Sequence, residues 1–281
     1  MIRIVEVGPR DGLQNESKMI PTDAKVAYID ALSEAGLHEI EASAFVSPKW
    51  IPQLADAVEV FGRIQRKAGV VYSALVPNEQ GLDRAMSAKA GKIAVFTAAS
   101  ESFNQKNINA TIAESIRRFV PVIRKAKAAG LPVRGYVSTA WWCPYEGRIA
   151  PVKSVEVVKQ LVDVGCDDLS IGDTIGKAEP DQVRELIELL LKAVPASRLA
   201  MHFHDTYHHA VANAVESYKL GITTFDSSAG GIGGCPYAPG ASGNVATEAL
   251  VAALRSVGGR CDVDLAKLAA ARAVIAAALG K

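Results

Sequence analysis

Short apolar runs rich in β-branched residues alternate with amphipathic segments along the chain. The runs have the length of buried strands, and the segments between them, such as DAKVAYIDALSEAG, carry apolar residues at helical spacing. We expect strands at residues 2–7, 37–43, 69–75, 92–98, 132–138, 167–173, 198–204 and 222–228. The pattern therefore predicts eight strand–helix units in succession.

Glycines support these boundaries. Gly36, Gly130, Gly165 and Gly221 each precede a predicted strand, at the place where a helix commonly ends in a glycine. Eight strand–helix repeats favour the α/β class and a parallel sheet closed into a (β/α)8 TIM barrel. A doubly wound open sheet is the alternative, disfavoured because no GxGxxG follows the first strand. Without a low-complexity linker, residues 1–281 are expected to form a single barrel domain with a C-terminal helical extension.

Composition narrows the class of protein. A chain of 281 residues, 49% hydrophobic and 22% charged, can bury a large core without disulfides. The formal net charge is +1 and the basic residues are scattered, which argues against a nucleic-acid partner. The apolar segment near the C-terminus is interrupted by Lys267 and Arg272 and is too short for a bilayer, so no membrane span is expected.

Cysteine usage and the first residues bear on the compartment. Cys143, Cys166, Cys235 and Cys261 show no CxxC spacing, which favours reduced thiols. The opening MIRIVEV already reads as a strand and leaves no room for a signal peptide before it. We therefore expect a cytoplasmic protein.

Histidine is concentrated in one stretch, MHFHDTYHH, which holds four of the five in the chain. His202 and His204 are two positions apart on a predicted strand, so their rings point the same way. Two imidazoles suit a first-row metal, but further ligands are needed to complete a site. His208 and His209 are expected one turn into the next helix, facing solvent.

Polar residues gather where the predicted strands end. These are Arg10 and Asp11 after the first strand, Glu41 near the end of the second, Asp173 and Thr174 after the sixth, His202 and His204 on the seventh, and Asn244 after the eighth. In a (β/α)8 barrel the carboxyl ends of the strands meet at one rim, which is where active sites lie. Asp11, His202, His204 and Asn244 would give mixed oxygen and nitrogen ligation, suited to Mg²⁺ or Mn²⁺, with zinc or cobalt as alternatives.

The segment AGGIGGCPYAPGASGN, residues 229–244, contains six glycines. It lacks the spacing of known phosphate-binding loops, and the glycines favour a mobile lid over the rim. Cys235 lies within it, and a glycine-rich polar loop favours a functional thiol over a buried one. Cys143 lacks flanking glycines, and we assign it a structural role.

Several motifs together resemble those of 3-hydroxy-3-methylglutaryl-CoA lyases. They are EVGPRDGLQNE (6–16), IEASAFVSPKW (40–50), GYVSTAWWCPYEG (135–147), IGDTIG (171–176), HFHDTY (202–207) and AGGIGGCPYAPGASGNVATE (229–248). The resemblance implies a metal-dependent lyase of the (β/α)8 class that cleaves an acyl-CoA substrate to acetyl-CoA and acetoacetate, as in leucine degradation. It also implies a homodimer.

The resemblance further implies roles for individual residues. The divalent-metal ligands would be Asp11, His202, His204 and Asn244, the catalytic arginine Arg10, the lid cysteine Cys235, and the supporting acidic residues Glu41, Asp173 and Glu248. Asp11 and His202 are both candidates for the base that removes the substrate's hydroxyl proton, although a metal ligand is a compromised base. Trp141–Trp142 departs from the family pattern, which has a smaller pair. These indoles either pack against the neighbouring loop or line the acyl pocket.

Two other functions stay open from the sequence. A condensing enzyme of the isopropylmalate or homocitrate synthase type would share the metal and the barrel, but such enzymes normally carry a further region after it. A non-catalytic barrel that binds a metal or an acyl-CoA is the second alternative. Within the lyase class, the substrate could also be citramalyl-CoA or an isoprenoid-branched analogue.

Overall fold

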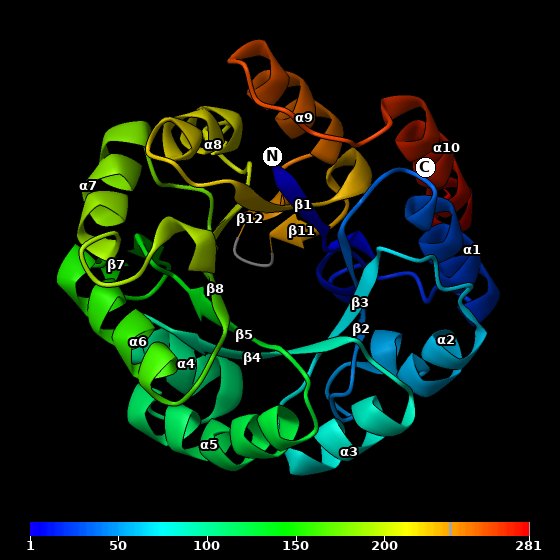
Figure 1. Cartoon of the computed structure of the whole chain (residues 1–281), viewed down its shortest axis with the longest axis horizontal. Helices are drawn as coiled ribbons and strands as arrows, with labels where there is room; N and C mark the ends of the chain where they lie inside the picture. The colour runs from blue at the N-terminus through cyan, green and yellow to red at the C-terminus, as the bar shows by residue number, and fades with distance from the viewer. Residues whose placement is uncertain (236–237, 281) are drawn as a thin grey trace.

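The computed structural model describes residues 1–235 and 238–280, and gives side chains for these residues except 234–242. Parallel strands close into a barrel in the order β1-β10-β9-β8-β5-β4-β3-β2, and helices surround it (Figure 1). The predicted (β/α)8 TIM barrel is confirmed, and the open sheet is excluded because β1 pairs with both β2 and β10.

All of the predicted strands are present, within two residues of their expected bounds. The barrel strands are β1 (Arg3–Glu6), β2 (Glu39–Ala44), β3 (Val71–Leu75), β4 (Lys92–Ala98), β5 (Val133–Ser138), β8 (Asp168–Asp173), β9 (Leu199–Phe203) and β10 (Thr224–Ser227). Two short antiparallel pairs lie outside the barrel: β6 (Trp142–Cys143) with β7 (Gly147–Arg148), and β11 (Gly234–Cys235) with β12 (Ala238–Ser242).

Helices connect the strands and cover the outside of the barrel. They are α1 (Thr22–Ser33), α2 (Ala57–Arg63), α3 (Glu79–Ser87), α4 (Glu101–Ile108), α5 (Ile112–Ala128), α6 (Pro151–Asp163), α7 (Pro180–Leu190), α8 (Ala210–Lys219), α9 (Thr247–Ser256) and α10 (Leu265–Leu279). Gly36, Gly130, Gly165 and Gly221 all have positive φ, as expected of helix-ending glycines. The C-terminal helix α10 packs against α1 on the outside of the barrel (Figure 1).

The two faces of each barrel strand differ in polarity. On β9, Leu199, Met201 and Phe203 belong to the apolar core between the strands and the helices. Alternate side chains point to the other face, so Ala200 and His202 face the barrel interior. Burying each large apolar side chain of this outer layer contributes about 1.5–3 kcal/mol to the stability of the fold. Because the outer layer supplies this stability, the interior positions are available for polar groups.

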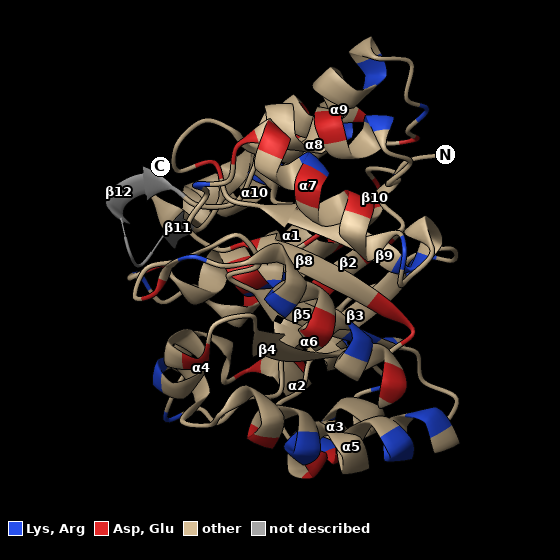
Figure 2. Ribbon diagram, turned by 90° about the vertical axis from the view of Figure 1, so that its left-hand side faces the viewer, with Lys and Arg blue, Asp and Glu red and all other residues tan. Residues whose placement is uncertain are grey.

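The surface carries no concentration of one charge on its visible helices. Figure 2 shows basic and acidic positions interspersed over α5, α6 and α7. Several are paired across or within elements, as in Lys125–Asp83 at 2.5 Å and Arg148–Glu185 at 2.8 Å. Among the described residues, no helix combines the length and apolar character needed to cross a membrane.

Candidate active site

A π-helical turn, Gly8–Gly12, follows β1 directly. The N–H groups of its last three residues all donate to the Val7 carbonyl oxygen, with N···O distances of 2.8–3.2 Å. A Cβ on Gly8 would lie only 2.5 Å from the Tyr28 hydroxyl and 2.6 Å from a Glu6 carboxylate oxygen, so this turn requires glycine. The turn is short and wide, and π-helical turns of this kind are frequent at functional sites.

The turn places Arg10 between two carboxylates. Arg10 Nε donates to Glu41 Oε2 at 2.6 Å and Nη1 donates to Asp11 Oδ1 at 2.7 Å. The guanidinium also lies 5.4 Å from the centre of the Tyr136 ring. Burial lowers the pKa of Arg10, but Glu41 and Asp11 raise it overall, so the group stays cationic. Arg10 and Asp11 therefore form an ion pair in which Arg10 is buried and Asp11 is partly buried.

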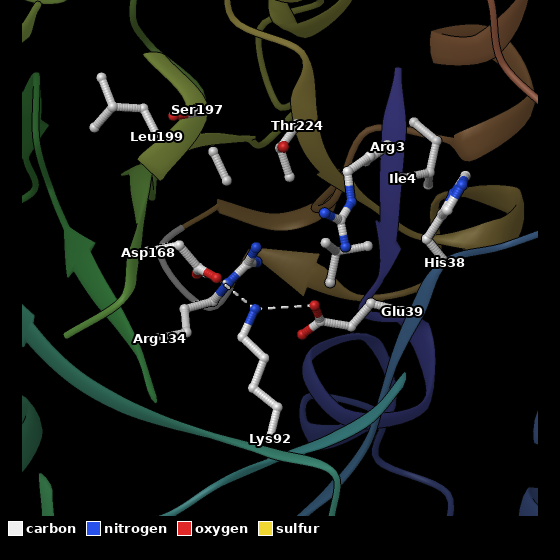
Figure 3. A pocket seen from close by; sticks show the side chains of 12 residues that line it. Arg3, Ile4, His38, Glu39, Lys92, Arg134, Asp168, Ser197, Leu199 and Thr224 are labelled. Atoms are coloured by element: carbon white, nitrogen blue, oxygen red, sulfur yellow. Dashed lines mark hydrogen bonds and ion pairs between the residues drawn. The ribbon is translucent and has the colours of Figure 1, made fainter. Parts of the chain in front are cut away.

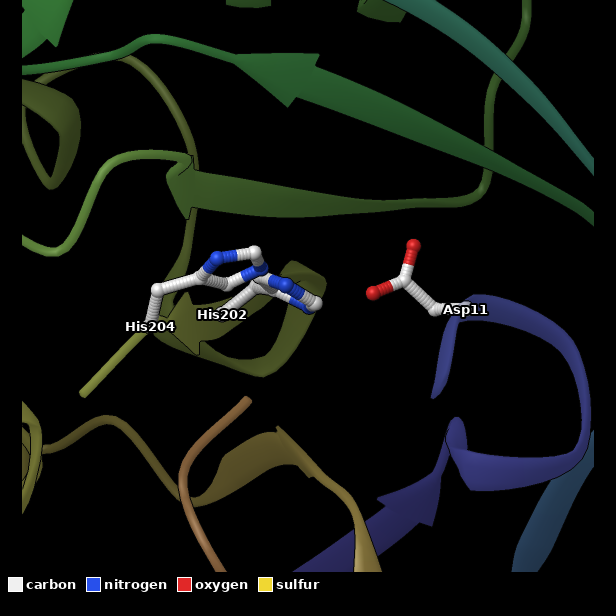
Figure 4. A group of neighbouring side chains, drawn as sticks. All are labelled: Asp11, His202 and His204. Carbon is white, nitrogen blue, oxygen red and sulfur yellow. The ribbon is translucent and has the colours of Figure 1, made fainter. Parts of the chain in front are cut away.

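Asp11 faces the two histidines of β9 and its end (Figure 4). One ligand atom from each of Asp11, His202 and His204 lies within 4.8 Å of the others, and the two imidazole centres are 5.2 Å apart. Burial raises the pKa of Asp11, but Arg10 and the histidines lower it to about 2. Burial and the neighbouring His202 lower the pKa of His204 to about 4. Near neutral pH the site thus offers a carboxylate and a neutral imidazole, both suited to a cation.

Asn244 completes the group. Its backbone forms a β-bridge with His204, which fixes it beside the histidine pair. Its side-chain Nδ2 donates to Asp11 Oδ2 at 3.0 Å. The amide oxygen, Oδ1, is buried and has no hydrogen-bond partner among the described residues. An amide in this orientation presents its oxygen as a free ligand.

Buried polar atoms that lack a hydrogen bond within the described part of the chain cluster at this site. They include Glu41 Oε1, His204 Nδ1 and Asn244 Oδ1; His202 Nδ1 also makes no hydrogen bond and lies 3.4 Å from Asp226 Oδ2. A buried polar atom without a partner is costly, and a bound cation is one of the few groups that could satisfy several together. Carboxylate, amide and imidazole donors form a set that divalent cations use. The residues present therefore fit a divalent metal.

The family model described as HMGL-like matches residues 1–275. The chain belongs to the HMGL-like family. Two relatives named as lyases are similar to this chain over its full length. A mitochondrial hydroxymethylglutaryl-CoA lyase from Bos taurus is 51% identical over 280 residues, covering 100% of this chain and 86% of the relative. A cytoplasmic 3-hydroxy-3-methylglutaryl-CoA lyase from Rattus norvegicus is also 51% identical, covering 100% and 82%.

Solved structures of HMGL-like proteins have the same fold throughout. The HMG-CoA lyase from Brucella melitensis superposes with a TM-score of 0.98 at 48% identity, covering 100% of this chain and 99% of that one. An HMG-CoA lyase from Acinetobacter baumannii, in complex with coenzyme A and 3-methylmalate, gives a TM-score of 0.94 at 37% identity, covering 100% and 92%.

The other two acidic residues predicted for the site, Asp173 and Glu248, accept hydrogen bonds from backbone N–H groups of neighbouring loops. Asp173 ends β8, and its oxygens accept the N–H groups of Lys177 at 3.2 Å and Ala178 at 2.8 Å. Burial raises the pKa of Asp173 to about 6. Glu248 lies in the first turn of α9 and accepts the Gly230 N–H at 2.9 Å. Both carboxylates thus hold loops at the rim in place.

Cys235 lies on β11, but its side chain is outside the described part of the structure. The start of the glycine-rich segment is described: Gly230, Gly231 and Gly233 have φ of +69°, +66° and +114°. These left-handed conformations favour glycine, in keeping with the composition of the loop. Cys143 is buried, and its Sγ lies 3.0 Å from Ser100 Oγ, which is consistent with the structural role assigned to it.

His208 and His209 precede α8, which begins at Ala210. The expectation that they lie inside the helix is therefore wrong. The side chain of His208 is 85% exposed, whereas His209 Nδ1 lies 3.2 Å from the Ala178 carbonyl oxygen. The helix starts later because His208 has a φ of +61°, which a right-handed helix does not accommodate.

Trp141 and Trp142 are both tied to α7. Trp141 Nε1 donates to the Gln182 carbonyl oxygen at 3.1 Å, and Trp142 Nε1 donates to the Gln182 side-chain oxygen at 2.9 Å. The Trp141 ring packs on Phe203, with ring centres 5.6 Å apart. Phe203 points outward from β9, so Trp141 packs between the barrel and its helices.

Sequence reasoning did not find Glu6 or Asp226, two buried carboxylates near the site. Glu6 accepts hydrogen bonds from the backbone of Gly8 at 3.0 Å and Ala229 at 2.9 Å, and from Thr247 Oγ1 at 2.8 Å. It therefore joins the π-helical turn to the glycine-rich segment. The available signal for Glu6 was an acidic residue inside a predicted strand, since such a residue is rarely buried without a specific partner.

Proposed function

We propose that this chain is a hydroxymethylglutaryl-CoA lyase that cleaves 3-hydroxy-3-methylglutaryl-CoA to acetyl-CoA and acetoacetate. The observation that carries the proposal is the buried group of Asp11, His202, His204 and Asn244 beside the Arg10 guanidinium. A set of metal-type ligands next to a fixed cation, with Asn244 Oδ1 and His204 Nδ1 lacking hydrogen bonds among the described residues, suits a reaction in which an alcohol loses its proton and an enolate forms. Full-length similarity to lyases of this name supports the same reading.

We propose Mg²⁺ or Mn²⁺ as the cation, because two of the four ligands would be oxygen atoms and two would be imidazoles. When bound, a divalent cation supplies a Lewis acid that makes a hydroxyl more acidic and orients the groups it binds. The four residues come from β9, the turn after β1 and the segment after β10, so the barrel strands fix their separation.

Arg10 is proposed to face the thioester oxygen of the substrate. Cleavage breaks the bond between the carbon bearing the hydroxyl and the carbon next to the thioester, and negative charge then develops on the thioester oxygen. Glu41 and Asp11 accept hydrogen bonds from Nε and Nη1 of Arg10, and these bonds fix the orientation of the guanidinium plane. A cationic donor already in position needs no reorganisation as the charge develops, and its removal typically costs about 2.7–4 kcal/mol.

The candidates for the base differ in their surroundings. The pKa of Asp11 is about 2, since Arg10 and the histidines outweigh the effect of burial. A carboxylate of this pKa is a poor proton acceptor near neutral pH. We therefore assign Asp11 to metal binding and to the orientation of Arg10, and not to proton removal. His202 is no better placed once one ring nitrogen binds the cation and the other carries a proton, so the base is assigned to neither residue.

Cys235 is proposed to return the proton to the enolate carbon. That carbon must gain a proton to become the methyl group of acetyl-CoA, and a thiol is a stronger acid than a hydroxyl. The glycine-rich segment that carries Cys235 begins directly after β10, at the same end of the barrel as Asp11. We propose that this segment closes over the site as a lid and excludes water from the carbanion.

The reaction can be tested directly. Purified protein, loaded with Mg²⁺ or Mn²⁺, is incubated with 3-hydroxy-3-methylglutaryl-CoA, and acetoacetate and acetyl-CoA are measured. Equal amounts of both products are expected. Absence of both from the metal-loaded protein, with the fold intact by circular dichroism, would contradict the proposal. Incubation with acetyl-CoA and a 2-oxo acid tests the condensing alternative, for which free coenzyme A would be released.

The substrate panel should include related thioesters. The Acinetobacter baumannii relative was solved with coenzyme A and 3-methylmalate, so the thioester of that acid belongs in the panel. Citramalyl-CoA and an isoprenoid-branched ester complete it. The highest kcat/KM identifies the substrate class, and we expect it for 3-hydroxy-3-methylglutaryl-CoA.

We further propose that the protein acts in leucine degradation, in the cytoplasm, as a homodimer. Both cytoplasmic and mitochondrial proteins occur among the relatives, so location has to be measured on this chain. Light scattering after gel filtration tests the oligomeric state. A mass near that of a single 29.7 kDa chain would contradict the dimer.

A further inference from the structure

Charged side chains fill the barrel interior on the side away from the candidate active site. Lys92 on β4 donates to Glu39 on β2 at 3.0 Å and to Asp168 on β8 at 2.6 Å (Figure 3). Arg134 on β5 donates through Nε to Asp168 at 2.7 Å and through Nη1 to Asp226 on β10 at 2.7 Å. Except for Arg134–Asp168, whose strands β5 and β8 are adjacent, these pairs join strands that are not neighbours in the sheet, so the network crosses the interior.

Asp226 is the member of this network that reaches the active site. It is 2% exposed and lies beside His202 in the register of β10 and β9, with both side chains on the inner face. One carboxylate oxygen accepts Arg134 Nη1, and the other accepts Ser170 Oγ at 2.6 Å. The second oxygen also lies 3.4 Å from His202 Nδ1. Arg134 and Ser170 thus fix a carboxylate against one edge of the His202 ring.

We propose that Asp226 is a positioning residue for the metal centre: it accepts the Nδ1 proton of His202 and so directs Nε2 of that ring toward the cation. The proposal rests on the metal site proposed above. A metal-binding histidine usually donates its second ring N–H to a carboxylate or carbonyl, which sets both its tautomer and its orientation. The separation of 3.4 Å is longer than the usual ~2.7–3.2 Å, and a small rotation of the ring would complete the bond.

The two histidines of the site differ in this respect. Neither His202 Nδ1 nor His204 Nδ1 makes a hydrogen bond within the described residues, but Asp226 Oδ2 lies 3.4 Å from His202 Nδ1, whereas no carboxylate among these residues forms an ion pair with the His204 ring. The barrel interior can therefore set the orientation of His202, through contacts that run from Asp226 to Arg134. The role differs from that of a ligand, because Asp226 is not part of the group formed by Asp11, His202 and His204.

Asp168 provides a matched control. It binds the same guanidinium as Asp226, through Arg134 Nε at 2.7 Å, but among the described residues its ion pairs are with Arg134 and Lys92 only. If Asp226 served only to balance Arg134 inside the barrel, Asp226→Asn and Asp168→Asn would have similar effects. If Asp226 positions His202, only Asp226→Asn will change metal binding.

The test measures Mn²⁺ binding by electron paramagnetic resonance in wild type, Asp226→Asn and Asp168→Asn. We expect Asp226→Asn to weaken Mn²⁺ binding by about 10–100-fold, and Asp168→Asn to stay within about threefold of wild type. Equal affinities in wild type and Asp226→Asn, or equal losses in both variants, would overturn the proposal. If wild type itself binds no Mn²⁺, the proposed metal site fails, and the positioning role fails with it.

A second measurement holds even if Asp226→Asn does not fold. Nitrogen-15 spectra of the metal-free wild type, in which only five histidines contribute, report the tautomer of each neutral ring. We expect the proton of His202 on Nδ1, facing Asp226. A neutral His202 protonated on Nε2 would overturn the proposal while leaving the proposed lyase function standing.

Discussion

Asn244 Nδ2 donates to Asp11 Oδ2 at 3.0 Å, across a sequence separation of 233 residues. The contact exists because the barrel closes: β1 pairs with β10, so the turn after the first strand meets the segment after the last. The hydrogen bond orients both groups: Asp11 Oδ1 accepts from Arg10 Nη1, and Asn244 Oδ1 is left without a hydrogen-bond partner among the described residues. Closure of the barrel therefore also brings the proposed ligands Asp11 and Asn244 together.

Metal binding should depend on this group. Asp11→Ala or His204→Ala removes one of the proposed ligands, and we expect Mn²⁺ affinity to fall by more than about tenfold in each. His208→Ala is the control, because that side chain is 85% exposed and lies outside the group. Isothermal titration measures the affinities. Unchanged binding in both ligand variants would remove the metal site from this position.

Turnover should depend on the shape of the cation at residue 10. In Arg10→Lys the ammonium cannot bind Glu41 and Asp11 and still present a donor to the substrate, as the guanidinium fork can. We expect kcat to fall by roughly 10²–10³ with KM changed by less than about threefold. Steady-state kinetics distinguish the two parameters. Near-normal kcat would make Arg10 only a structural partner of the two carboxylates.

Stability should vary with pH through Glu6. Burial raises the pKa of Glu6 from 4.5 to about 8, outweighing the hydrogen bonds that lower it. Folding thus favours the neutral form of the Glu6 carboxyl. The contribution of Glu6 to stability is complete below pH 4.5 and is lost as pH rises from 4.5 through about 8. Relative to Glu6→Gln, which cannot ionise, wild type should lose up to about 1.4 kcal/mol of unfolding free energy per pH unit in that window.

Urea unfolding of both proteins across this pH range measures the difference. Glu185→Gln, at a side chain that is 51% exposed, controls for the general loss of one negative charge. Free energies of unfolding that run parallel with pH in wild type and Glu6→Gln would show that Glu6 does not titrate in this window.

The thiol of Cys235 should matter for turnover and not for folding. In Cys235→Ser a hydroxyl of similar size replaces the thiol. Because a hydroxyl is the weaker acid, we expect kcat to fall by at least about tenfold. Cys261→Ser is the matched control, since Cys261 is a half-exposed free thiol before α10. Equal turnover in the two variants would argue against a role for Cys235 in proton transfer.

The strands and the histidine pair were predictable from sequence because both depend on local spacing. A period of two places His202 and His204 on one face, and apolar runs of the right length define each strand. The contact of Asp226 with His202 depends instead on the register between β10 and β9, which no local pattern contains. The hydrogen bond between Glu248 and Gly230 also depends on how the segment after β10 folds back. The glycine content of that segment does not determine its path.

The last prediction concerns Trp141 and Trp142, which the sequence left either packed against the neighbouring loop or lining the acyl pocket. Both indoles hydrogen-bond to Gln182 on α7, outside the barrel, whereas Arg10 and His202 lie inside. Trp141 is 3% exposed, so Trp141→Ala should cost about 3–5 kcal/mol of unfolding free energy. Trp142 is half-buried with the Lys177 ammonium 4.1 Å from its ring centre, and Trp142→Gly should cost less.

Neither substitution should change substrate preference, because the rings support α7 and do not line the interior. We expect the ratio of kcat/KM values for 3-hydroxy-3-methylglutaryl-CoA and a longer-branched ester to move by less than about threefold in both variants. One methylene in an acyl pocket is worth about 1–3 kcal/mol, or roughly 10–200-fold, so a ring that lined the pocket would shift the ratio well beyond that. A tenfold rise for the longer ester in Trp142→Gly would place that indole in the acyl pocket after all.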